Sequence, residues 1–219
     1  MDAENRKIPS HEVTYGRLRD MILFGHLEPG QPVTIQGLIR DLEAGMTPVR
    51  EAIRRLTAEG ALLPQGNRRV SVPQMTPDHL EQVAFARLTI EPKLAELAAR
   101  NLTPDLIARL EAIDDSVDAA IRKADIPGYL AANHAFHFAL YEAADAPILL
   151  DMARSMWLRF GPSLRIVCER GGAASLPDRH AEALAAMAAG DAAGLARAIQ
   201  NDIQQGVDQI REAQAQGDV

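Results

Sequence analysis

Three arginines close together near the N-terminus have the residue type and the spacing of a DNA contact. Arg50 and Arg54 are four residues apart in the helical pattern VREAIRRLTAE and share one polar face, and Arg55 follows directly. An arginine fork matches guanine O6 and N7, or a phosphate. The spacing therefore favours a DNA-reading helix, and a solvated charged face is the alternative that the arginines alone leave open.

A second basic group lies in the segment ALLPQGNRRVSVP, which follows that helix. Gly66 and Asn67 stand between two short apolar runs, which predicts a hairpin. Asn67, Arg68 and Arg69 at the hairpin tip are placed to reach phosphates or the minor groove. The hairpin and the helix together indicate DNA binding more strongly than the arginines do alone.

The elements that position these residues have the order of a winged helix-turn-helix. Apolar spacing predicts a helix over 13–22, a second helix that Thr34 caps and Gly45 ends, and a third that runs to Gly60. Thr47 followed by Pro48 predicts the N-cap of the third helix. Because such a helix enters the major groove N-terminal end first, Thr47 joins the predicted DNA contacts.

From residue 78 onward the apolar spacing is helical throughout. The predicted helices cover residues 78–100, 104–124, 126–144, 147–170, 177–189 and 191–214, and Pro or Gly separates them. We predict a mainly α protein with two domains. Residues 1–76 form the winged helix-turn-helix, and residues 77–219 form an all-helical bundle of about six helices.

Composition and charge agree with this organisation. The chain has 219 residues, 47% hydrophobic and 24% charged, which excludes a disordered chain, a fibre or a disulfide scaffold. Residues 1–76 carry a net charge of +1 and residues 77–219 a net charge of −8, so only the first part is expected to meet a polyanion. The single cysteine, Cys168, fits a reducing compartment. Without an apolar span or leader-like N-terminus, a cytoplasmic location is expected.

Segment 13–73 resembles the DNA-binding domain of the GntR family of bacterial transcriptional regulators. The resemblance rests on TPVREAIRRLTAEGALL (47–63) and LRDMILFGHLEPGQPV (18–33). It implies that Arg50 contacts bases. The family commonly has Ser-Arg before Thr-Pro, whereas this chain has Gly45 and Met46. An arginine that often contacts bases is therefore absent at Met46, and the operator is expected to differ from the family's common one.

Residues 78–214 resemble the FCD-type effector domain of the FadR subfamily. The matching segments are ARLTIEPKLAELAA (86–99), ANHAFHFALYEAADAPIL (132–149) and RHAEALAAMAAGDAAGLARAIQNDI (179–203). In that family an aspartate, a histidine four residues later and two further histidines hold a divalent metal. The matching positions here are Asn133, His137, His180 and Asp202. The resemblance implies an altered metal site, in which one carboxylate is lost and another is gained.

This donor set suits Zn, Ni or Mn, because it offers an amide carbonyl, a carboxylate and two imidazoles. Asn133 and His137 share a helix face, as two ligands must. A metal-free, hydrogen-bonded polar cluster is the alternative. His134 lies off that face and is expected at the surface or behind the ligands, and Arg179 is expected to be a solvated surface charge.

The resemblance also implies an effector cavity. Arg87 matches a position where an arginine reaches the ligand, so we expect it to pair with an effector carboxylate beside Asn133, His137 and His180. A salt bridge from Arg87 to Glu91, four residues on, is the alternative.

Aromatic residues and two more arginines lie near these positions. Helical spacing predicts packing roles for Phe136, Phe138, Trp157 and Phe160. Arg159 and Arg165 fall near the last two, and one of these arginines is expected to line the effector cavity.

Together these features predict a DNA-binding transcriptional regulator whose helical domain senses a small organic acid, with a bound divalent metal. A homodimer is expected, because paired half-sites match a two-fold protein. An effector-free DNA-binding repressor is one alternative. A small metal-dependent hydrolase is another, but the sequence shows no nucleophile constellation and no general base besides the ligands, so we expect no enzyme and no catalytic residue.

Overall fold

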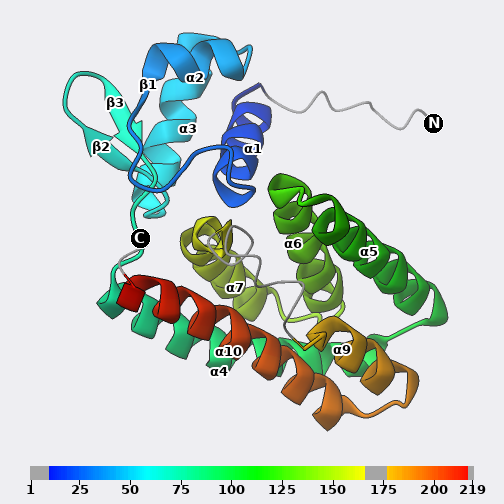
Figure 1. Ribbon diagram of the computed structural model, residues 1–219. Helices are drawn as coiled ribbons and strands as arrows, with labels where there is room; N and C mark the ends of the chain where they lie inside the picture. The colour runs from blue at the N-terminus through cyan, green and yellow to red at the C-terminus, as the bar shows by residue number, and fades with distance from the viewer. Residues whose placement is uncertain (1–9, 166–176, 217–219) are drawn as a thin grey trace, which may run out of the picture.

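The computed structural model describes residues 10–165 and 177–216, and Cys168 lies outside them. The N-terminal unit comprises α1 (Ser10–Leu23), β1 (Val33–Thr34), α2 (Ile35–Asp41), α3 (Met46–Ala58), β2 (Leu63–Gln65) and β3 (Arg69–Ser71). The bundle comprises α4 (Pro77–Ala98), α5 (Pro104–Lys123), α6 (Ile126–Glu142), α7 (Pro147–Phe160), α9 (Arg179–Ala188) and α10 (Ala192–Gln216). The predicted fold class, a winged helix-turn-helix followed by a helical bundle, is confirmed (Figure 1).

The wing is a three-stranded sheet rather than a simple hairpin. Strands β2 and β3 pair antiparallel, with Gln65 opposite Arg69, and β1 adds to the other edge of β3, with Val33 opposite Val70. The sequence predicts the hairpin but not β1. A two-residue strand has no alternation of apolar and polar residues from which it could be predicted.

The caps of the short helices are only partly as predicted. Thr34 caps α2, and its hydroxyl accepts a hydrogen bond from the Gly37 N–H. The prediction of Thr47 as the N-cap of α3 was wrong. Gly45 holds that place in extended conformation, with no side-chain cap, and its carbonyl accepts from the Val49 N–H. Thr47 therefore lies inside the first turn of α3.

The predicted helix over 147–170 also ends early. The α-helix stops at Phe160, and residues Gly161–Leu164 form a 3-10 turn. Residues 166–170 of the predicted helix lie outside the described part of the chain. Pro162 has no N–H to donate to the carbonyl four residues earlier, so an α-helix cannot continue normally through it. None of the helices in the described ranges is both long and apolar enough to cross a membrane.

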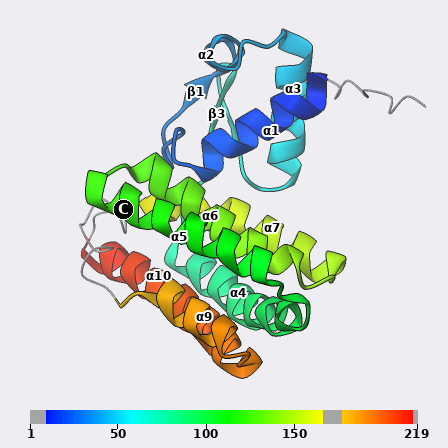
Figure 2. The same cartoon turned by 90° about the vertical axis from the view of Figure 1, so that its right-hand side faces the viewer.

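The two parts of the molecule meet along α7. Helices α4 and α10 run side by side, and the N-terminal unit lies on the side of α6 and α7 (Figure 2). Leu158 of α7 is buried in the apolar core of the N-terminal unit. Arg165 donates a hydrogen bond to the Gly25 carbonyl and pairs with Glu28. The bundle therefore contacts the DNA-binding unit through packing and charge.

Candidate metal and effector site

Helix α6 carries the first two residues of the predicted metal set. Asp125 caps it by accepting a hydrogen bond from the Gly128 N–H. The i,i+4 spacing then places Asn133 and His137 on one inward face, where their exposed fractions are 6% and 0%. Buried polar side chains need partners, so these two residues mark a built polar site inside the bundle.

The other two residues come from α9 and α10. Asp178 caps α9 through the Ala181 N–H, and this cap starts the helix just before the buried His180. Asp202 lies on α10. One ligand atom from each of His137, His180 and Asp202 falls within 4.8 Å of the others. The structure thus brings together three of the four predicted ligands, and Asn133 lines the same cavity.

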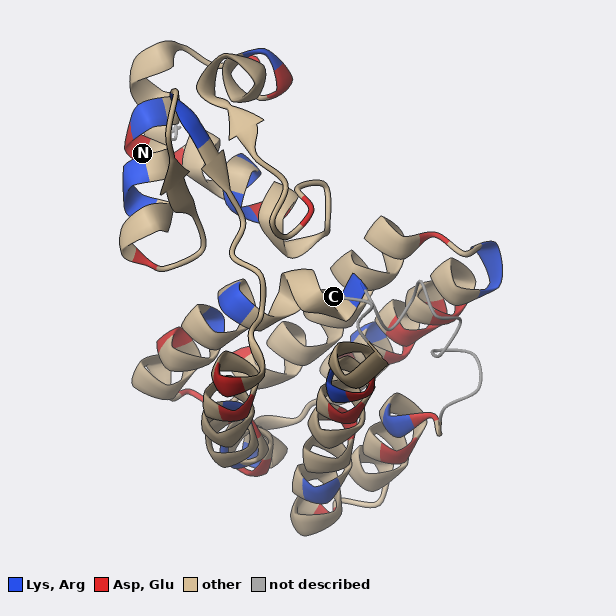
Figure 3. Cartoon of the chain, turned by 60° about the vertical axis from the view of Figure 1, so that its left-hand side comes forward, with Lys and Arg blue, Asp and Glu red and all other residues tan. Residues whose placement is uncertain are grey.

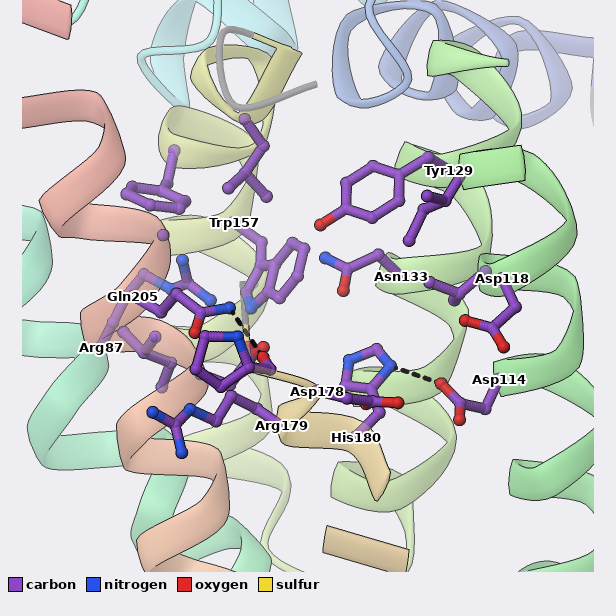
Figure 4. Close-up of a pocket in the computed structure, with 18 of the residues that line it drawn as sticks. Arg87, Asp114, Asp118, Tyr129, Asn133, Trp157, Asp178, Arg179, His180 and Gln205 are labelled. Carbon is purple, nitrogen blue, oxygen red and sulfur yellow. Dashed lines mark hydrogen bonds and ion pairs between the residues drawn. The ribbon is translucent and has the colours of Figure 1, made fainter. Parts of the chain in front are cut away.

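A cavity of about 320 Å³ adjoins this cluster. Figure 4 shows Asn133 and Tyr129 on one side of it and Arg87 and Gln205 on the other, with His180 and Arg179 in the lower part of the view. The volume lies at the small end of the usual range for ligand pockets, so it suits a small metabolite.

Hydrogen bonds fix which nitrogen of His137 carries the proton. Its Nδ1 lies 3.0 Å from the Tyr141 hydroxyl oxygen, and that hydroxyl donates its own hydrogen to Glu91 Oε2 at 2.8 Å. The hydroxyl oxygen must therefore accept from Nδ1–H. A neutral His137 then carries its lone pair on Nε2, which is the atom that faces Asp202.

His180 is held in the same way. Its Nδ1 lies 2.9 Å from Asp114 Oδ1 (dashed in Figure 4), so Nδ1 donates and Nε2 is left as the lone-pair atom. Among the described residues, the buried Nε2 atoms of both histidines lack a hydrogen-bond partner. Two orphaned imidazole nitrogens beside a carboxylate fit a divalent metal, since a metal would use both lone pairs.

The charge of Asp202 is stabilised by its surroundings. Burial alone would raise its pKa, but His137, then His180 and Arg87, outweigh burial and hold the pKa of Asp202 at about 2. Burial lowers the pKa of His180, but the hydrogen bond to Asp114 and the charge of Asp202 outweigh it and raise the pKa above its ordinary value. A metal at this site would therefore have to displace a proton from His180.

Arg87 forms the predicted alternative, a salt bridge. Its Nε lies 2.5 Å from Glu91 Oε1, and Nη2 lies 3.1 Å from Oε2, with both side chains buried. Glu91 also accepts from the Tyr141 hydroxyl and from Trp157 Nε1. Arg87 lines the cavity as well, so the effector role assigned to it stays a prediction.

Several residues that line the cavity were not predicted from the sequence. Arg179, expected to be a solvated surface charge, lines it, pairs with Glu182 and keeps a buried Nε without a partner among the described residues. Asp114 and Tyr129 also line it. The acidic run Asp114-Asp115 on a predicted helix gave a weak signal, but only the fold shows which carboxylate turns inward.

The neighbouring arginines and aromatic residues take different places. Phe136, Phe138, Trp157 and Phe160 are buried as predicted. Neither Arg159 nor Arg165 is among the residues that line this cavity. His134 is partly buried and packs between Phe24, Phe138 and Trp157, with ring centroids 5.8, 4.3 and 5.4 Å away.

The three arginines of α3 differ in their surroundings. Arg50 is exposed and forms no ion pair in the described part of the chain. Arg54 is exposed and pairs with Glu51 at 2.6 Å. Arg55 has partners within the N-terminal unit. It pairs with Glu12 and Glu59, and its Cζ lies 3.7 Å from the centroid of the Tyr15 ring. Of the three, Arg50 is the side chain most ready to meet DNA.

The hairpin tip presents its basic residues on a tight turn. Asn67 and Arg68 both adopt left-handed backbone, with φ of 60° and 58°, and they lead into Arg69 of β3. All three are exposed. Figure 3 shows Lys and Arg on the helices and strands of the N-terminal unit, and it shows both basic and acidic segments on the bundle. The predicted contacts thus lie on two adjoining elements of one unit.

Family models match both parts of the chain. Residues 11–72 match the model for bacterial regulatory proteins of the gntR family, and residues 82–205 match the FCD domain. The second match covers more than half of the chain.

Individual relatives agree with these matches. The HTH-type transcriptional regulator McbR of Escherichia coli (strain K12) is 30% identical over 194 residues, which is 87% of each chain. The solved structure of E. coli McbR/YncC superposes with a TM-score of 0.86 over 94% of this chain and 99% of that one, at 27% identity. A GntR regulator structure from Rhodococcus sp. RHA1, 22% identical, shares the fold with a TM-score of 0.74 over 93% and 98%. These relatives are transcriptional regulators and not enzymes. The chain therefore belongs to the GntR family of bacterial transcriptional regulators and carries an FCD effector domain after its DNA-binding domain.

Proposed function

We propose that this regulator binds operator DNA as a homodimer in the cytoplasm, and that a small organic acid in the bundle cavity changes its affinity for that DNA. The acid is bound together with a divalent metal held by His137, His180 and Asp202, with Asn133 beside them. One observation carries the metal: the buried Nε2 atoms of His137 and His180, which lack a hydrogen-bond partner among the described residues, lie with an Asp202 oxygen within 4.8 Å of one another. When bound, a divalent cation supplies positive charge and open coordination positions for an acid.

The charges that line the cavity support this combination. Four carboxylates line it, namely Asp114, Asp118, Asp178 and Asp202. Three arginines line it as well, and Arg87, Arg122 and Arg179 are each paired with a carboxylate, that of Glu91, Asp118 and Glu182 respectively. An acidic ligand therefore gains little from the side chains alone, and a divalent cation beside Asp202 reverses the local balance of charge. For regulation, the acid must bind one arrangement of the DNA-binding units better than the other.

A thermal-shift experiment tests the metal and the acid together. Purified protein treated with EDTA is compared with protein given Zn²⁺, Ni²⁺ or Mn²⁺, with and without a panel of small carboxylates. A ligand at about 100 times its Kd stabilises a fold by about 2.7 kcal/mol, which for this chain length raises Tm by roughly 2–4 °C per kcal/mol. We expect the metal to raise Tm and an acid to raise it further.

Matched variants locate the effect. Asp202→Ala removes the shared carboxylate, whereas Asp208→Ala removes an exposed carboxylate of the same helix. The metal shift is expected to vanish only in Asp202→Ala. If an acid still binds in EDTA, the site is a metal-free polar pocket and not a metal site. If no acid binds, the effector-free repressor is the better description.

The homodimer is supported by an exposed aromatic side chain. Phe85 of α4 is 76% exposed, although phenylalanine is usually buried. We expect Phe85→Glu to give a monomer with weaker operator binding, and Phe85→Leu to stay a dimer. Light scattering after gel filtration gives the mass directly. A monomeric parent protein, or a dimer that survives Phe85→Glu, would contradict this interface.

A further inference from the structure

A second, larger cavity lies between the DNA-binding unit and the bundle. Its volume is about 690 Å³, within the usual range for small-molecule sites. It is lined by Gly60, Leu63, Val72, Pro73, Gln74, Met75 and Thr76, by His79, Gln82 and Val83 of α4, and by Met156, Leu158 and Arg159 of α7. None of these residues lines the first cavity.

The walls of this cavity are mainly apolar. Val72, Val83 and Leu158 are buried, and the side chains of Met75 and Met156 are half-buried. Methionine side chains adapt their shape, and their sulfur atoms make favourable contacts with aromatic rings. Two methionines in one pocket therefore favour a ligand with an aromatic body.

Arg159 gives the cavity one fixed positive charge. It donates to Ser155 Oγ at 2.7 Å and forms no ion pair with any carboxylate of the described chain. The lining contains no aspartate or glutamate. A guanidinium with free donors in an apolar pocket favours an anion, and a carboxylate matches its fork.

The same guanidinium lies against the end of the recognition helix. Gly60 follows α3 with a φ of +76°, and a Cβ at this position would lie 2.8 Å from Arg159 Nη2. A side chain at this position would push the guanidinium aside, and the positive φ itself favours glycine. An anion that engages Arg159 would therefore act at the contact between α7 and the C-terminal end of α3.

We propose that this interdomain cavity is a second ligand site, for an aromatic carboxylic acid. The carboxylate pairs with Arg159, and the ring packs against the methionine and valine side chains. Helix α7 forms a wall of both cavities, because Trp157 and Phe160 line the first and Met156 and Arg159 line the second. A ligand here contacts both domains, so its binding depends on how the DNA-binding unit is placed.

Calorimetric titration of the full chain with 2-naphthoate tests the site. Arg159→Gln removes the charge, and Gln82→Trp fills the cavity from an exposed position on α4. Arg154→Gln is the control, since Arg154 is exposed on the same helix and pairs with Glu142 and Asp151. We expect the affinity to fall at least ten-fold in the first two variants and to be unchanged in the third. The neutral amide, naphthalene-2-carboxamide, is expected to bind wild type as weakly as 2-naphthoate binds Arg159→Gln.

Several results would overturn the proposal. Wild-type protein that does not bind 2-naphthoate, or that binds it equally well in Arg159→Gln and Gln82→Trp, has no such site. If Asp202→Ala weakens 2-naphthoate binding instead, the acid occupies the first cavity. Asp202 lines the first cavity and not the second, so Asp202→Ala tests the first site separately from the second. Unfolding curves for each variant show whether the fold is kept.

Discussion

His137 Nε2 faces Asp202 Oδ2 at 3.1 Å, a distance that fits an ion pair, but without the angle of a hydrogen bond. Because the Tyr141 hydroxyl oxygen accepts a hydrogen bond from Nδ1–H, a neutral His137 turns the lone pair of Nε2 toward a carboxylate. Two electron-rich atoms at this distance need a cation between or beside them, either a proton on the imidazole or a metal. Asn133 lacks the carboxylate that the family has at this position. Asp202 of α10 supplies a carboxylate instead, and it lies beside the same imidazole, that of His137.

Asp114 is predicted to support metal binding without touching the metal. It holds His180 Nδ1 at 2.9 Å and so directs Nε2 toward Asp202. Outer partners of this kind are typically worth 10–100-fold in metal affinity. We expect Asp114→Asn to weaken Ni²⁺ binding by that factor in a calorimetric titration. Asp115→Asn, which changes the exposed neighbour, is the control. Equal Ni²⁺ affinity in both variants would remove Asp114 from the site.

Arg50 is predicted to carry base-specific affinity. It is the arginine of α3 with no acidic partner in the described chain, and it lies in the first turns of the recognition helix. Loss of one bidentate base contact costs about 1–3 kcal/mol, or up to roughly 100-fold in Kd. We expect this loss for Arg50→Ala, measured by anisotropy on an operator selected from random DNA.

Arg40→Ala provides the comparison for Arg50→Ala. Arg40 is exposed on α2 of the same unit and pairs with Asp41. In either variant, the loss of a purely electrostatic attraction would lower the affinity for all DNA sequences alike. The loss of a base contact lowers the affinity for the selected operator only. If Arg50→Ala keeps full specific affinity, the recognition-helix contact has been placed on the wrong residue.

The long periodic elements were predictable from sequence, and the details that depend on neighbours were not. Helices α4 to α6 each have a proline in the first two positions beside a good cap, such as Thr103 before Pro104, and their bounds agree with prediction within a few residues. The helix over 147–170 was wrong because an apolar pattern continues through Pro162, where a 3-10 turn forms. Periodicity records which residues turn inward, but not whether each N–H has an acceptor.

The candidate site shows the same division. The resemblance alone identified Asn133, His137, His180 and Asp202, which lie far apart in sequence. The fold brings Asn133, His180 and Asp202 to one cavity, and it places His137 behind the lining, within ligand distance of His180 and Asp202. Asp114 was missed, since a carboxylate on an acidic helix face gives no sign of its partner. Arg179 was missed for a related reason, because a charged residue at a helix start is usually solvated.

Glu91 is predicted to be essential for stability. It is fully buried and accepts from Arg87, Tyr141 and Trp157. Glu91→Gln leaves the Arg87 charge buried without a counter-charge, and breaking a buried pair in this way costs about 3–5 kcal/mol. We expect the unfolding free energy in urea to fall by that amount. Glu96→Gln, which removes an exposed partner of Lys93 on the same helix, should have little effect.

His134 is predicted to make stability depend on pH below neutrality. Burial among aromatic rings, then the charges of Arg19, His137 and Arg154, lower its pKa from 6.5 to about 3. Between these values the unfolded chain binds a proton that the folded chain does not, so stability is complete above about pH 6.5 and falls as pH falls. One such proton gives a slope of about 1.4 kcal/mol per pH unit.

The slope of the unfolding free energy against pH is measured by urea unfolding between pH 4.5 and 6. Above about pH 4.5 Asp202 is almost fully ionised in both states, and the raised pKa of His180 affects stability only above this window, so neither contributes much to the slope. His134→Phe keeps an aromatic ring among Phe24, Phe138 and Trp157 and is expected to reduce the slope by about 1.4 kcal/mol per pH unit. His26→Phe, at an exposed position, should leave it unchanged. A slope that persists in His134→Phe would mean that the junction between the two domains accommodates a charged imidazole.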